Sequence, residues 1–441
     1  MAIVGLGYVG LPLAIEIAKK RREINSNTKK DNIIIGYDVN LNRINELKSF
    51  IDKSGEINSH DLKCNDIIKF TNDKKDLIKA DVFIVTVPTP VNESNLPDLS
   101  SLKNATKEIG EAIKKRYLNK ASTIPLIIYE STVYPGATEE ICIPILEKYS
   151  GLSFNNYELN SFHIGYSPER INPGDKSKNL KNIIKVTSGS SELSANWVDN
   201  FYKMFISAGT HLAPSIKVAE AAKIIENTQR DLNIALINEL AIICHRLNID
   251  TLDVIDAAST KWNFLKFRPG LVGGHCIGVD PYYLAYKSKK EGYYPEVVLA
   301  GRRINERMAE WIVEQVVLQL SKRGQIVGGS KVLILGFTFK ENCKDIRNTK
   351  VIKMIDSMKT YGIEPVVHDP IADPLEAKNK FNVNLKANLN SIESYSVVLV
   401  AQKHDFYLNF DEKVWANLIV RDGFFFDIKG IVPRALNPVR I

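Results

Sequence analysis

Ala2-Ile3-Val4-Gly5-Leu6-Gly7-Tyr8-Val9-Gly10 is a short apolar run that passes directly into a glycine turn, and Leu11 to Lys20 then shows helical periodicity. Strand, glycine turn and helix in this order is the context in which G-x-G-x-x-G binds a dinucleotide. Gly5 allows the tight turn, Gly7 lets the backbone approach a pyrophosphate, and Gly10 lets the helix pack on the strand. The stretch therefore predicts a Rossmann-like domain whose first helix points its N-terminus at the phosphates.

The next expected strand, Ile33-Ile34-Ile35-Gly36-Tyr37-Asp38, ends in an acid. A carboxylate at this point can bind the ribose 2′-hydroxyl and repel a 2′-phosphate, so NAD is favoured over NADP. Asp38 lies 28 residues beyond Gly10, and the charged stretch from Lys19 to Asp31 accounts for the extra length. Arg43, one helical turn further on, either contacts the same ribose or is solvated.

Two later runs, Asp81 to Pro90 and Leu126 to Val133, are rich in β-branched residues, as strands of parallel sheets are. The first ends in small and rigid residues, where a loop on the nicotinamide side is expected. The second ends in hydroxyl-bearing residues and is followed by Pro135-Gly136 and an expected helix. Thr132 either positions water or cofactor or caps the following helix. The expected cofactor contacts, besides the glycines, Asp38 and Arg43, are Tyr8, Val9, Thr86, Pro88, Thr89, Ser131 and Thr132.

The bulk composition bounds the class of protein. A chain of 441 residues predicts two or three domains, and 44% hydrophobic with 25% charged residues is ordinary for a soluble protein. Five scattered cysteines without a CxxC pair favour a reducing cytoplasm over disulfides or structural zinc. No apolar run approaches the length of a membrane span, and the opening strand leaves no room for a signal peptide. The net charge of +7 suits anionic small ligands, and no arginine-rich tract with aromatics indicates nucleic acid.

The stretch Phe162 to Gly174 contains Ser167-Pro168-Glu169-Arg170 and has turn formers at both ends, which suggests a shaped loop. Glu169 could act as a base, and Arg170 could bind a phosphate or sugar oxygen. The alternative is a surface ion pair.

From Pro214 to Leu247 the chain has an amphipathic pattern without internal glycine or proline, longer than a typical globular helix. Such a helix can connect two domains and supply a dimer face. Lys223, Asn227 and Arg230 follow at i, i+4 and i+7, so they share one face. They form either a site or a solvated edge.

Gly273-Gly274-His275-Cys276-Ile277-Gly278-Val279-Asp280-Pro281 places one cysteine in a turn of small residues. Glycine there allows the backbone to approach a ligand closely. The Cys276 thiol is a candidate nucleophile, and the alternative is a small buried hydrophobe in a turn. No metal site is expected.

After Gly328-Gly329, the run Lys331 to Lys340 opens a second strand–turn–helix unit. Further strands are expected at 364–368, 396–401 and 424–428, and Asp369-Pro370 ends a strand much as Asp38 does. Lys340 and Arg347 either contact a phosphate or ribose or lie on the surface. The fold class expected is α/β, with two Rossmann-like doubly wound domains joined by a long central helix and a helical domain. The expected boundaries are 1–205, 206–322 and 323–441.

The order of these motifs is similar to that of the nucleotide-sugar 6-dehydrogenase family of the UDP-glucose/GDP-mannose type. The motifs are GLGYVG, EST-V-PG, SPER-NPG, a lysine–asparagine helix, GGHC-x-x-x-D and GFTFK. Within the family, SPERINPGD and KWNFLKFRPGLVGGHCIGVDPYYL resemble the branch that oxidises UDP-N-acetylhexosamines. They most resemble enzymes that make UDP-N-acetylglucosaminuronate for capsular or Vi-type polysaccharides. Arg170-Ile171 stands where UDP-glucose enzymes tend to carry a phenylalanine–leucine pair.

The resemblance implies a cytoplasmic enzyme that performs a four-electron oxidation at C6 with two NAD per sugar. Cys276 would add to the intermediate aldehyde, and a thioester would then be hydrolysed. Lys223 would stabilise oxyanions, and Asn227 would orient the same oxygen or a water. Asp280 and Thr132 would hold the hydrolytic water, with Glu169 as general base.

The resemblance also implies that UDP lies between domains and that the enzyme is a homodimer or higher oligomer. The substrate contacts implied are Arg170, Ile171, Lys223, Asn227, Arg230, Phe264, Gly270, Gly274, Phe339 and Lys340, with Arg303 from a partner subunit. Arg347 would contact a phosphate or ribose and is counted among the cofactor contacts.

Three alternatives remain open from the sequence. The same chemistry could act on UDP-N-acetylgalactosamine or UDP-N-acetylmannosamine. A two-electron β-hydroxyacid dehydrogenase shares the Rossmann and helical domains but needs no cysteine loop and no third domain. An inactive sensor of NAD or nucleotide sugar is disfavoured by the intact Cys276, Lys223 and Asp280. The number of NADH released per substrate separates these classes.

Overall fold

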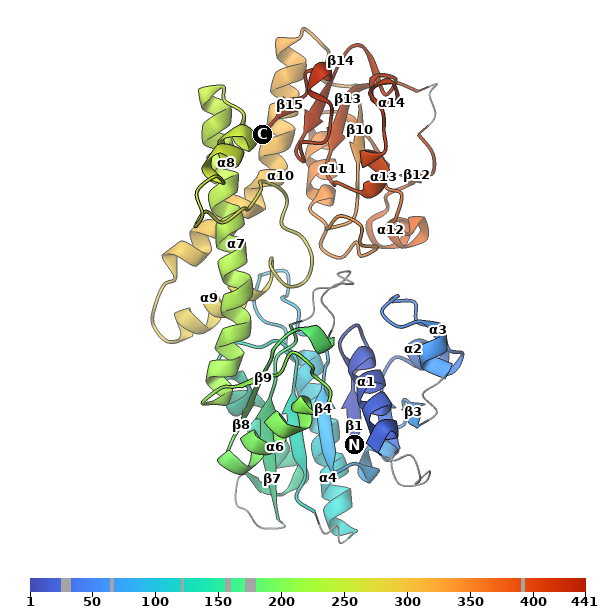
Figure 1. Ribbon diagram of the computed structural model, residues 1–441, viewed down its shortest axis with the longest axis vertical. Coiled ribbons are helices and arrows are strands. Elements are labelled where there is room, and N and C mark those ends of the chain that lie inside the picture. Colours follow the sequence, from blue (N-terminus) through green and yellow to red (C-terminus); the bar gives the residue numbers. More distant parts are fainter. Residues whose placement is uncertain (25–32, 64–66, 120–122, 155–159, 171–179, 390–392) are drawn as a thin grey trace. The chain divides into compact units, whose positions relative to one another are not determined.

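The computed structural model describes residues 1–24, 33–63, 67–119, 123–154, 160–170, 180–389 and 393–441 (Figure 1). The chain divides into two compact units. Unit 1 comprises residues 1–226 and 282–292, and unit 2 comprises residues 227–281 and 293–441.

Unit 1 is built on a nine-stranded sheet within the described ranges. Its strands are β1 (Ala2–Val4), β2 (Ile34–Tyr37), β3 (Ile68–Thr71), β4 (Val82–Val85), β5 (Leu126–Tyr129), β6 (Ser153–Phe154), β7 (Ser161–Tyr166), β8 (Lys185–Gly189) and β9 (Thr210–Leu212). They lie in the order β3-β2-β1-β4-β5-β7-β8-β9, with β6 beside β7. The first strand pairs in parallel on both sides, with Ile3 opposite Gly36 and Ile84, and only the β7–β8 pair is antiparallel among these described strands. This is the strand order of a Rossmann domain, a fold that binds its ligands where the order reverses, here beside β1.

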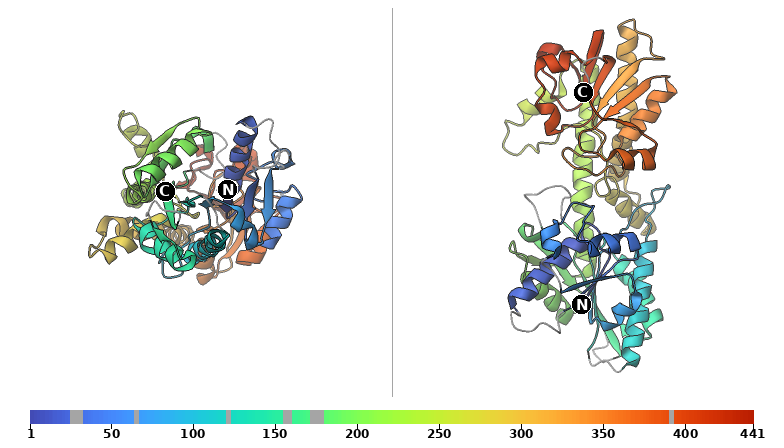
Figure 2. Two further views of the ribbon diagram at one scale, coloured as in Figure 1. Left: turned by 90° about the horizontal axis from the view of Figure 1, so that it is seen from below. Right: turned by 90° about the vertical axis from the view of Figure 1, so that its right-hand side faces the viewer.

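Helices cover both faces of this sheet (Figure 2). The helical segments of unit 1 are α1 (Gly10–Ile24), α2 (Leu41–Lys48), α3 (Ser59–Lys63), η1 (Lys74–Lys79), α4 (Ser100–Leu118), η2 (Thr138–Cys142), α5 (Ile143–Ser150), η3 (Leu180–Asn182), α6 (Glu192–Lys203) and most of α9 (Asp280–Lys290), which lies beside α7 in Figure 1. Leu13 and Ile17 of α1 pack with Phe201 and Tyr202 of α6 on buried side chains of the strands. The carboxyl ends of the strands are thereby held at one edge, where a ligand site is expected.

The prediction of a loop over residues 162–174 is wrong for its first part, because residues 161–166 form β7 between β5 and β8. All six residues of β7 are buried. Gly165 is required there, because a Cβ would come within 2.6 Å of Val198 on α6. The turn formers that suggested a loop begin only after the strand, at Ser167.

Unit 2 contains the second sheet, in the order β12-β11-β10-β13-β14-β15. Its strands are β10 (Lys331–Leu335), β11 (Glu364–His368), β12 (Leu385–Lys386), β13 (Tyr395–Val400), β14 (Ile419–Asp427) and β15 (Val439–Arg440), all paired in parallel. The helices of unit 2 are α8 (Thr251–Ala258), α10 (Glu296–Lys322), α11 (Val351–Thr360), α12 (Pro374–Phe381), α13 (Asp405–Leu408), α14 (Glu412–Ala416) and η4 (Arg434–Leu436). Counted along the chain, this order repeats that of unit 1, so the expected second Rossmann-like domain is confirmed.

The long central helix is also confirmed, as α7 (Ile216–Leu247) has 32 residues and begins two residues after the expected Pro214. It ends where Asn248 adopts a left-handed φ of 57°. The Ile249 N–H then donates to the Cys244 carbonyl at 3.1 Å, which satisfies one of the last open carbonyls of the helix. No helix among the described residues is long and apolar enough to cross a membrane.

Candidate active site

The glycine turn of unit 1 has the geometry of a dinucleotide site. Gly5 has a φ of 97°, and a Cβ at Gly10 would lie 1.9 Å from the Gly5 carbonyl oxygen and 2.4 Å from the Thr86 hydroxyl. A Cβ at Gly7 would meet nothing within 4 Å. Gly5 and Gly10 therefore serve the turn and its packing, whereas Gly7 leaves open space in front of α1, where a pyrophosphate would lie.

Asp38 and Arg43 hold this turn from the end of β2 and from α2. Asp38 Oδ2 accepts the Leu6 N–H at 2.8 Å, and Oδ1 accepts the Asn40 N–H at 2.9 Å. Arg43 donates Nε–H to the Leu6 carbonyl at 2.9 Å and pairs with Asp52 at 2.8 Å. The carboxylate is thus fixed beside the turn, as a group that selects an adenosine ribose must be.

Replacing Asp38 with asparagine is expected to lower the preference for NAD over NADP about tenfold, because the repulsion of a 2′-phosphate is removed. The measurement is the ratio of kcat/KM for the two cofactors. An unchanged ratio in a folded variant would show that Asp38 supports the turn and does not select the cofactor.

The ends of β4 and β5 are tied to each other and to the turn. The Thr86 hydroxyl donates to the Gly5 carbonyl at 2.7 Å, the Ser131 hydroxyl to the Val87 carbonyl at 2.7 Å, and the Thr89 hydroxyl to the Thr132 carbonyl at 2.6 Å. Tyr283 of α9 donates its hydroxyl to the Thr89 and Pro90 carbonyls, at 2.8 and 3.1 Å. Of the other expected contacts, Val9 is buried, Tyr8 and Thr132 are half-buried and Pro88 is exposed.

Glu169 lies beside a buried charge cluster that sequence reasoning missed. Glu130 pairs with Lys185 at 2.7 Å and bonds the Tyr202 hydroxyl, and all three side chains are buried. Burial raises the pKa of Glu130, Lys185 lowers it, and the neighbouring Glu169 raises it further. Glu169 itself is only 5% exposed. No local pattern marks Lys185 as buried, because it opens a short strand next to surface residues.

Arg170 is held against α7. Its guanidinium pairs with Glu226 at 2.8 Å and donates to the Ile184 carbonyl at 2.7 Å. The ion-pair alternative is thus met, with Glu226 of the central helix as the partner, whereas the binding of a phosphate or sugar oxygen by Arg170 stays a prediction. Ile171 lies outside the described residues.

Glu220 of α7 is a second carboxylate that the sequence did not reveal. It is fully buried and accepts the N–H groups of Gly136 and, at 2.9 Å, Thr138, so it caps the helical turn that follows Thr132. Burial raises the pKa of Glu220 from its ordinary 4.5 to about 7, against the opposing effect of these hydrogen bonds. The loop after β5 is therefore fixed to α7 one turn before Lys223.

This shift predicts a pH dependence of stability. Because the folded-state pKa exceeds the unfolded one, the stabilisation is fully present below about pH 4.5 and is lost as the pH rises through about 7. The loss amounts to about 3 kcal/mol in the free energy of unfolding, at about 1.4 kcal/mol per pKa unit. Urea titrations at pH 5 and pH 8 should show this step in the wild type and not in Glu220→Gln. Equal steps in both proteins would contradict the assignment.

The polar residues on α7 differ in burial. Lys223 is 6% exposed and makes no ion pair with any residue that the structure describes, whereas Arg230 is exposed. Asn227 donates its side-chain N–H to Asp280 Oδ2 at 2.6 Å. The structure thus brings together Asn227 and Asp280, which lie 53 residues apart along the chain.

Cys276 lies in a turn that ends at the first residue of α9. Its carbonyl accepts the N–H groups of Val279 and Asp280, at 3.0 and 2.8 Å, and its side chain is half-buried. Gly274 has a φ of 79°, and a Cβ there would come within 2.9 Å of the Phe339 ring. Asn348 donates its side-chain N–H to the Gly274 carbonyl at 3.1 Å. The glycines therefore let the cysteine turn sit directly on the segment that follows β10.

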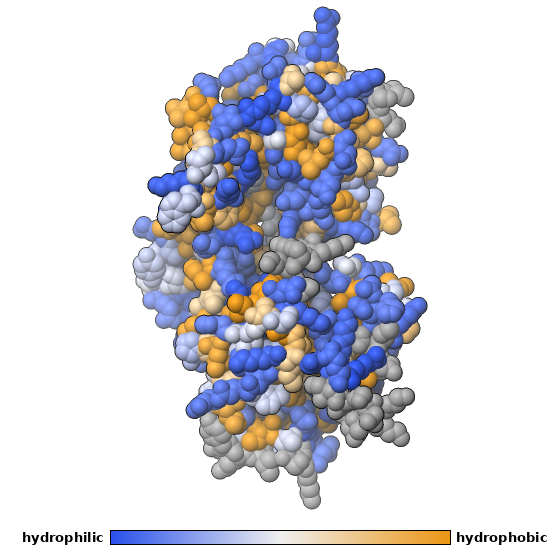
Figure 3. All heavy atoms as spheres, in the orientation of Figure 1, coloured by the Kyte–Doolittle hydropathy of each residue, from blue (hydrophilic) through white to orange (hydrophobic). Residues whose placement is uncertain are grey.

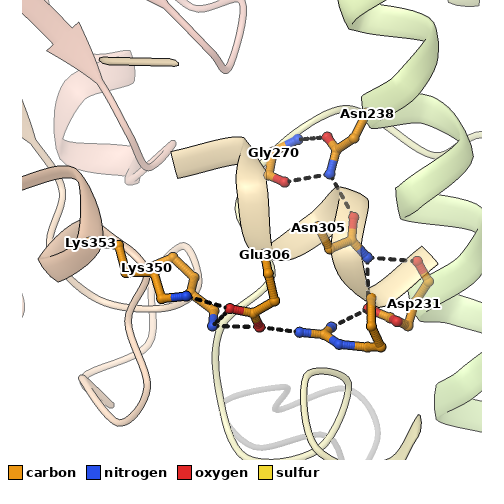
Figure 4. Close-up of polar contacts among 8 residues, drawn as sticks. Asp231, Asn238, Gly270, Asn305, Glu306, Lys350 and Lys353 are labelled. Carbon is orange, nitrogen blue, oxygen red and sulfur yellow. Dashed lines mark hydrogen bonds and ion pairs between the residues drawn. The ribbon is translucent and has the colours of Figure 1, made fainter. Parts of the chain in front are cut away.

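A buried amide pair fixes the chain before this turn (Figure 4). Asn238 of α7 accepts the Gly270 N–H at 2.9 Å and donates to the Gly270 carbonyl at 3.1 Å. Asn238 also donates to Asn305 of α10 at 2.8 Å, and Asn305 donates to the Asp231 carboxylate at 2.7 Å. These bonds hold the loop that leads to Cys276 to two helices of unit 2.

The same network continues into a charge cluster (Figure 4). Arg302 is 2% exposed and pairs with Asp231 at 2.6 Å and with Glu306. Glu306 also binds Lys350 at 2.7 Å and Lys353 at 2.6 Å. Burial raises the pKa of Glu306, but these cations outweigh it and bring the pKa to about 2. Arg302 is thus the buried member of the Arg302-Arg303 pair, whereas the sequence pointed only to Arg303 as a functional residue.

The remaining expected substrate residues are scattered over unit 2. Phe264 packs against the small apolar cluster of Ile237, Leu252 and Ile255. Lys340 is half-buried and Arg303 is exposed. Arg347 is exposed and pairs with Asp345, so it is held at the surface. Within the described ranges, no group of three or more His, Cys, Asp or Glu side chains is arranged to hold a metal ion.

Two Rossmann-like domains, one with a glycine turn shaped for a dinucleotide, define an α/β protein that binds a dinucleotide. Residues 1–206 match the NAD binding domain of the UDP-glucose/GDP-mannose dehydrogenase family, residues 217–307 its central domain and residues 333–434 its UDP binding domain. The chain therefore belongs to the UDP-glucose/GDP-mannose dehydrogenase family, and the expected family, enzyme class and cofactor are confirmed.

Relatives and a solved structure match over nearly the full length. The chain is 48% identical to the UDP-N-acetyl-D-glucosamine 6-dehydrogenase of Pseudomonas aeruginosa, over 100% of this chain and 99% of that protein. It is 47% identical to the enzyme of the same name from Salmonella typhi, over 100% and 98%. The structure of a UDP-D-ManNAc dehydrogenase from Pyrococcus horikoshii superimposes with a TM-score of 0.84, at 27% identity over 98% of this chain and 96% of that one.

Proposed function

We propose that the protein oxidises the C6 alcohol of UDP-N-acetyl-D-glucosamine to the carboxylate, giving UDP-N-acetyl-D-glucosaminuronate for surface polysaccharide synthesis. The observation that carries the choice of sugar is full-length identity near one half to two enzymes named for this substrate. The solved relative named for the manno sugar is only 27% identical. The UDP-binding domain supports a UDP-linked substrate.

The chemistry follows from the need to oxidise one carbon twice. NAD, when bound, accepts one hydride in each oxidation. The Cys276 thiol adds across the intermediate aldehyde, so that carbon gains a sulfur and its oxygen gains a proton. After the second oxidation, the resulting thioester is hydrolysed by water, which restores the thiol and leaves the carboxylate.

Burial and pairing support the roles of the polar residues. Lys223 is a buried ammonium without a described ionic partner, so it suits an oxygen that becomes negative during the reaction. The Asn227 side-chain N–H donates to Asp280, so the amide is held in one orientation, which suits a group that orients an oxygen or a water. Thr132 and Asp280 hold the hydrolytic water, and the buried Glu169 removes its proton.

The substrate contacts come from all three family domains. Arg170 and Lys223, with the loop from Phe264 to Gly274, bind the sugar and diphosphate, and Phe339 with Lys340 binds the uridine diphosphate from the last domain. Arg303 is exposed, as a residue given to a partner subunit must be. The division at 1–205, 206–322 and 323–441 is supported by the three family matches.

The deciding experiment counts NADH at completion with limiting UDP-N-acetylglucosamine and excess NAD. Two NADH per sugar are expected, with slow reaction of the galacto, manno and glucose analogues. Two NADH with another sugar would replace the substrate and keep the chemistry. One NADH, or none, would remove the thioester route.

We also propose that α7 forms a homodimer interface. Leu236, Ile243 and Leu247 are spaced by seven and four residues, so they share a helix face, and they are 63%, 48% and 63% exposed. Figure 3 shows hydrophobic surface over this end of α7. An apolar stripe of this kind on a long helix is suited to packing against a second copy.

Replacing both Leu236 and Ile243 with glutamate is expected to convert the dimer to a monomer, because each change buries a charge in the interface. Light scattering at micromolar concentration measures the mass. The matched control is Leu318→Glu on α10, where the native side chain is 41% exposed. A wild-type monomer, or a dimer that survives both changes, would remove α7 as the interface.

The reducing cytoplasm is the proposed compartment. No disulfide joins the described cysteines Cys142, Cys244, Cys276 and Cys343 to one another. A nucleophilic thiol needs such conditions to stay reduced.

A further inference from the structure

The turn of residues 337–342 follows β10 in unit 2 and is held by several buried partners. Asp369, at the end of β11, accepts the Phe337 N–H at 2.6 Å and the Thr338 N–H at 3.0 Å with the same oxygen, Oδ2. Gln402 donates its side-chain N–H to the Thr338 carbonyl at 2.8 Å. The first half of the turn is thus bonded to the ends of both neighbouring strands.

His404 holds the second half of the turn and is fully buried. Its Nδ1 accepts the Asn342 N–H at 3.0 Å, so the ring proton of the neutral imidazole must be on Nε2. Nε2 lies 3.1 Å from Asp369 Oδ2 and 3.3 Å from the Thr338 hydroxyl. One imidazole therefore joins the two ends of the turn to the carboxylate, in a single tautomer.

The conformation of the turn needs this support. Asn342 has a φ of 55°, in the left-handed region that is costly for residues other than glycine. The Asn342 side chain accepts the Asp405 N–H at 3.0 Å, immediately after His404 in the chain. Backbone in such a region persists when its surroundings determine it, and it is concentrated at functional sites.

The 337–342 turn packs against the cysteine turn that contains Gly273, Gly274 and Cys276. A Cβ at Gly273 would lie 3.0 Å from Phe339 Cβ, and one at Gly274 would lie 2.9 Å from the Phe339 ring. The turn also carries Lys340. The position of the 337–342 turn therefore fixes the Phe339 ring against the cysteine turn. It also fixes Phe339 and Lys340 as the two side chains expected to bind the nucleotide.

We propose that His404 and Asp369 are positioning residues, which hold the 337–342 turn so that Phe339 and Lys340 bind the uridine diphosphate part of the substrate. The inference rests on the proposed function for the role of those two side chains. In this role neither His404 nor Asp369 contacts the substrate, because both side chains are buried and bonded within the protein. They act through the backbone N–H groups of Phe337, Thr338 and Asn342.

Two substitutions separate the two bonds of the imidazole. In His404→Asn, the amide oxygen can replace Nδ1 as acceptor for Asn342, and the bond to Asp369 is lost. In His404→Gln, the amide N–H can replace Nε2–H as donor to Asp369, and the bond to Asn342 is lost. Each variant is expected to raise the Kd for UDP, measured by calorimetry on the full chain, and the KM for the UDP-sugar about tenfold, with kcat and the KM for NAD nearly unchanged.

Two further measurements separate positioning from a purely structural role. A structural role would reduce the amount of folded enzyme and leave the KM of the remainder at the wild-type value. In ¹⁵N spectra of histidine-labelled enzyme, His404 should show a bare Nδ1 and a protonated Nε2. The matched control is Tyr407→Phe, which removes a buried hydroxyl bonded to His368 at 2.9 Å and is expected to leave the Kd for UDP unchanged.

The outcomes separate a failure of the positioning role from a failure of the proposed substrate. UDP binding does not depend on the sugar, so a raised Kd for UDP in both variants supports the positioning role even if UDP-N-acetylglucosamine is not oxidised. Wild-type values for the Kd of UDP and the KM of the UDP-sugar in both folded variants would overturn it, whatever the NADH count. Equal losses in Tyr407→Phe would also overturn it, because they would show general damage to the aromatic cluster.

Discussion

Replacing Cys276 with serine is expected to lower turnover by at least about 10³-fold while NAD binding survives. A hydroxyl at neutral pH is a far weaker nucleophile than a thiol, so the aldehyde is not captured for the second oxidation. The glycine turn, Asp38 and the ends of β4 and β5 all lie in unit 1 and are unchanged by the substitution. Steady-state turnover and NAD titration by fluorescence measure the two quantities.

Cys244→Ala is the matched control, because Cys244 is a buried free thiol on α7. It is expected to retain full turnover. In a single-turnover experiment, Cys276→Ser should release at most one NADH per sugar. Unchanged steady-state turnover of Cys276→Ser would rule out the thioester mechanism.

The second large effect is expected for Lys223→Ala, which should lower kcat by about 10²- to 10³-fold and change the Kd for the nucleotide sugar much less. In the proposed mechanism Lys223 stabilises an oxygen whose negative charge develops during the reaction, so its removal should affect the transition state more than the bound substrate. Stopped-flow measurement of NADH formation gives the chemical rate, and calorimetry gives the affinity.

Lys217→Ala is the control, because Lys217 lies on the same helix with a side chain that is 59% exposed. Its kcat should equal that of the wild type. A rise in Kd for Lys223→Ala without any loss of kcat would reduce Lys223 to a binding residue.

The parts of the fold that local chemistry determines could be predicted from the sequence. The glycine turn, the β-branched strands and the helix after Pro214 each depend on residues close together in the chain. β7 was missed because its run Phe162-His163-Ile164-Gly165-Tyr166 is followed at once by turn formers. Its strand character comes from pairing with β5 and β8, which no local pattern contains.

The same limit applies to the candidate site. Cys276, Lys223 and Asp280 stand in recognisable motifs. Arg302 and Arg303 are adjacent and identical in type, and only the packing of α10 against α7 decides that Arg302 is the buried one. Lys185, Glu220 and His404 also act through partners that are remote in the sequence.

Each of the two Rossmann-like sheets has an aspartate directly after its second strand, Asp38 after β2 and Asp369 after β11. The two aspartates differ in how many hydrogen bonds their carboxylates already accept. A carboxylate can accept about four hydrogen bonds. Asp38 accepts two backbone N–H groups, so about half of its capacity is left for a ribose. Asp369 accepts the N–H groups of Phe337, Thr338, Ile371 and Ala372 and also bonds His404, which leaves it saturated. The same position thus keeps acceptor capacity for a ribose in the first sheet, as predicted for Asp38, and is internal scaffolding in the second, where Asp369 has no acceptor position left for a ribose.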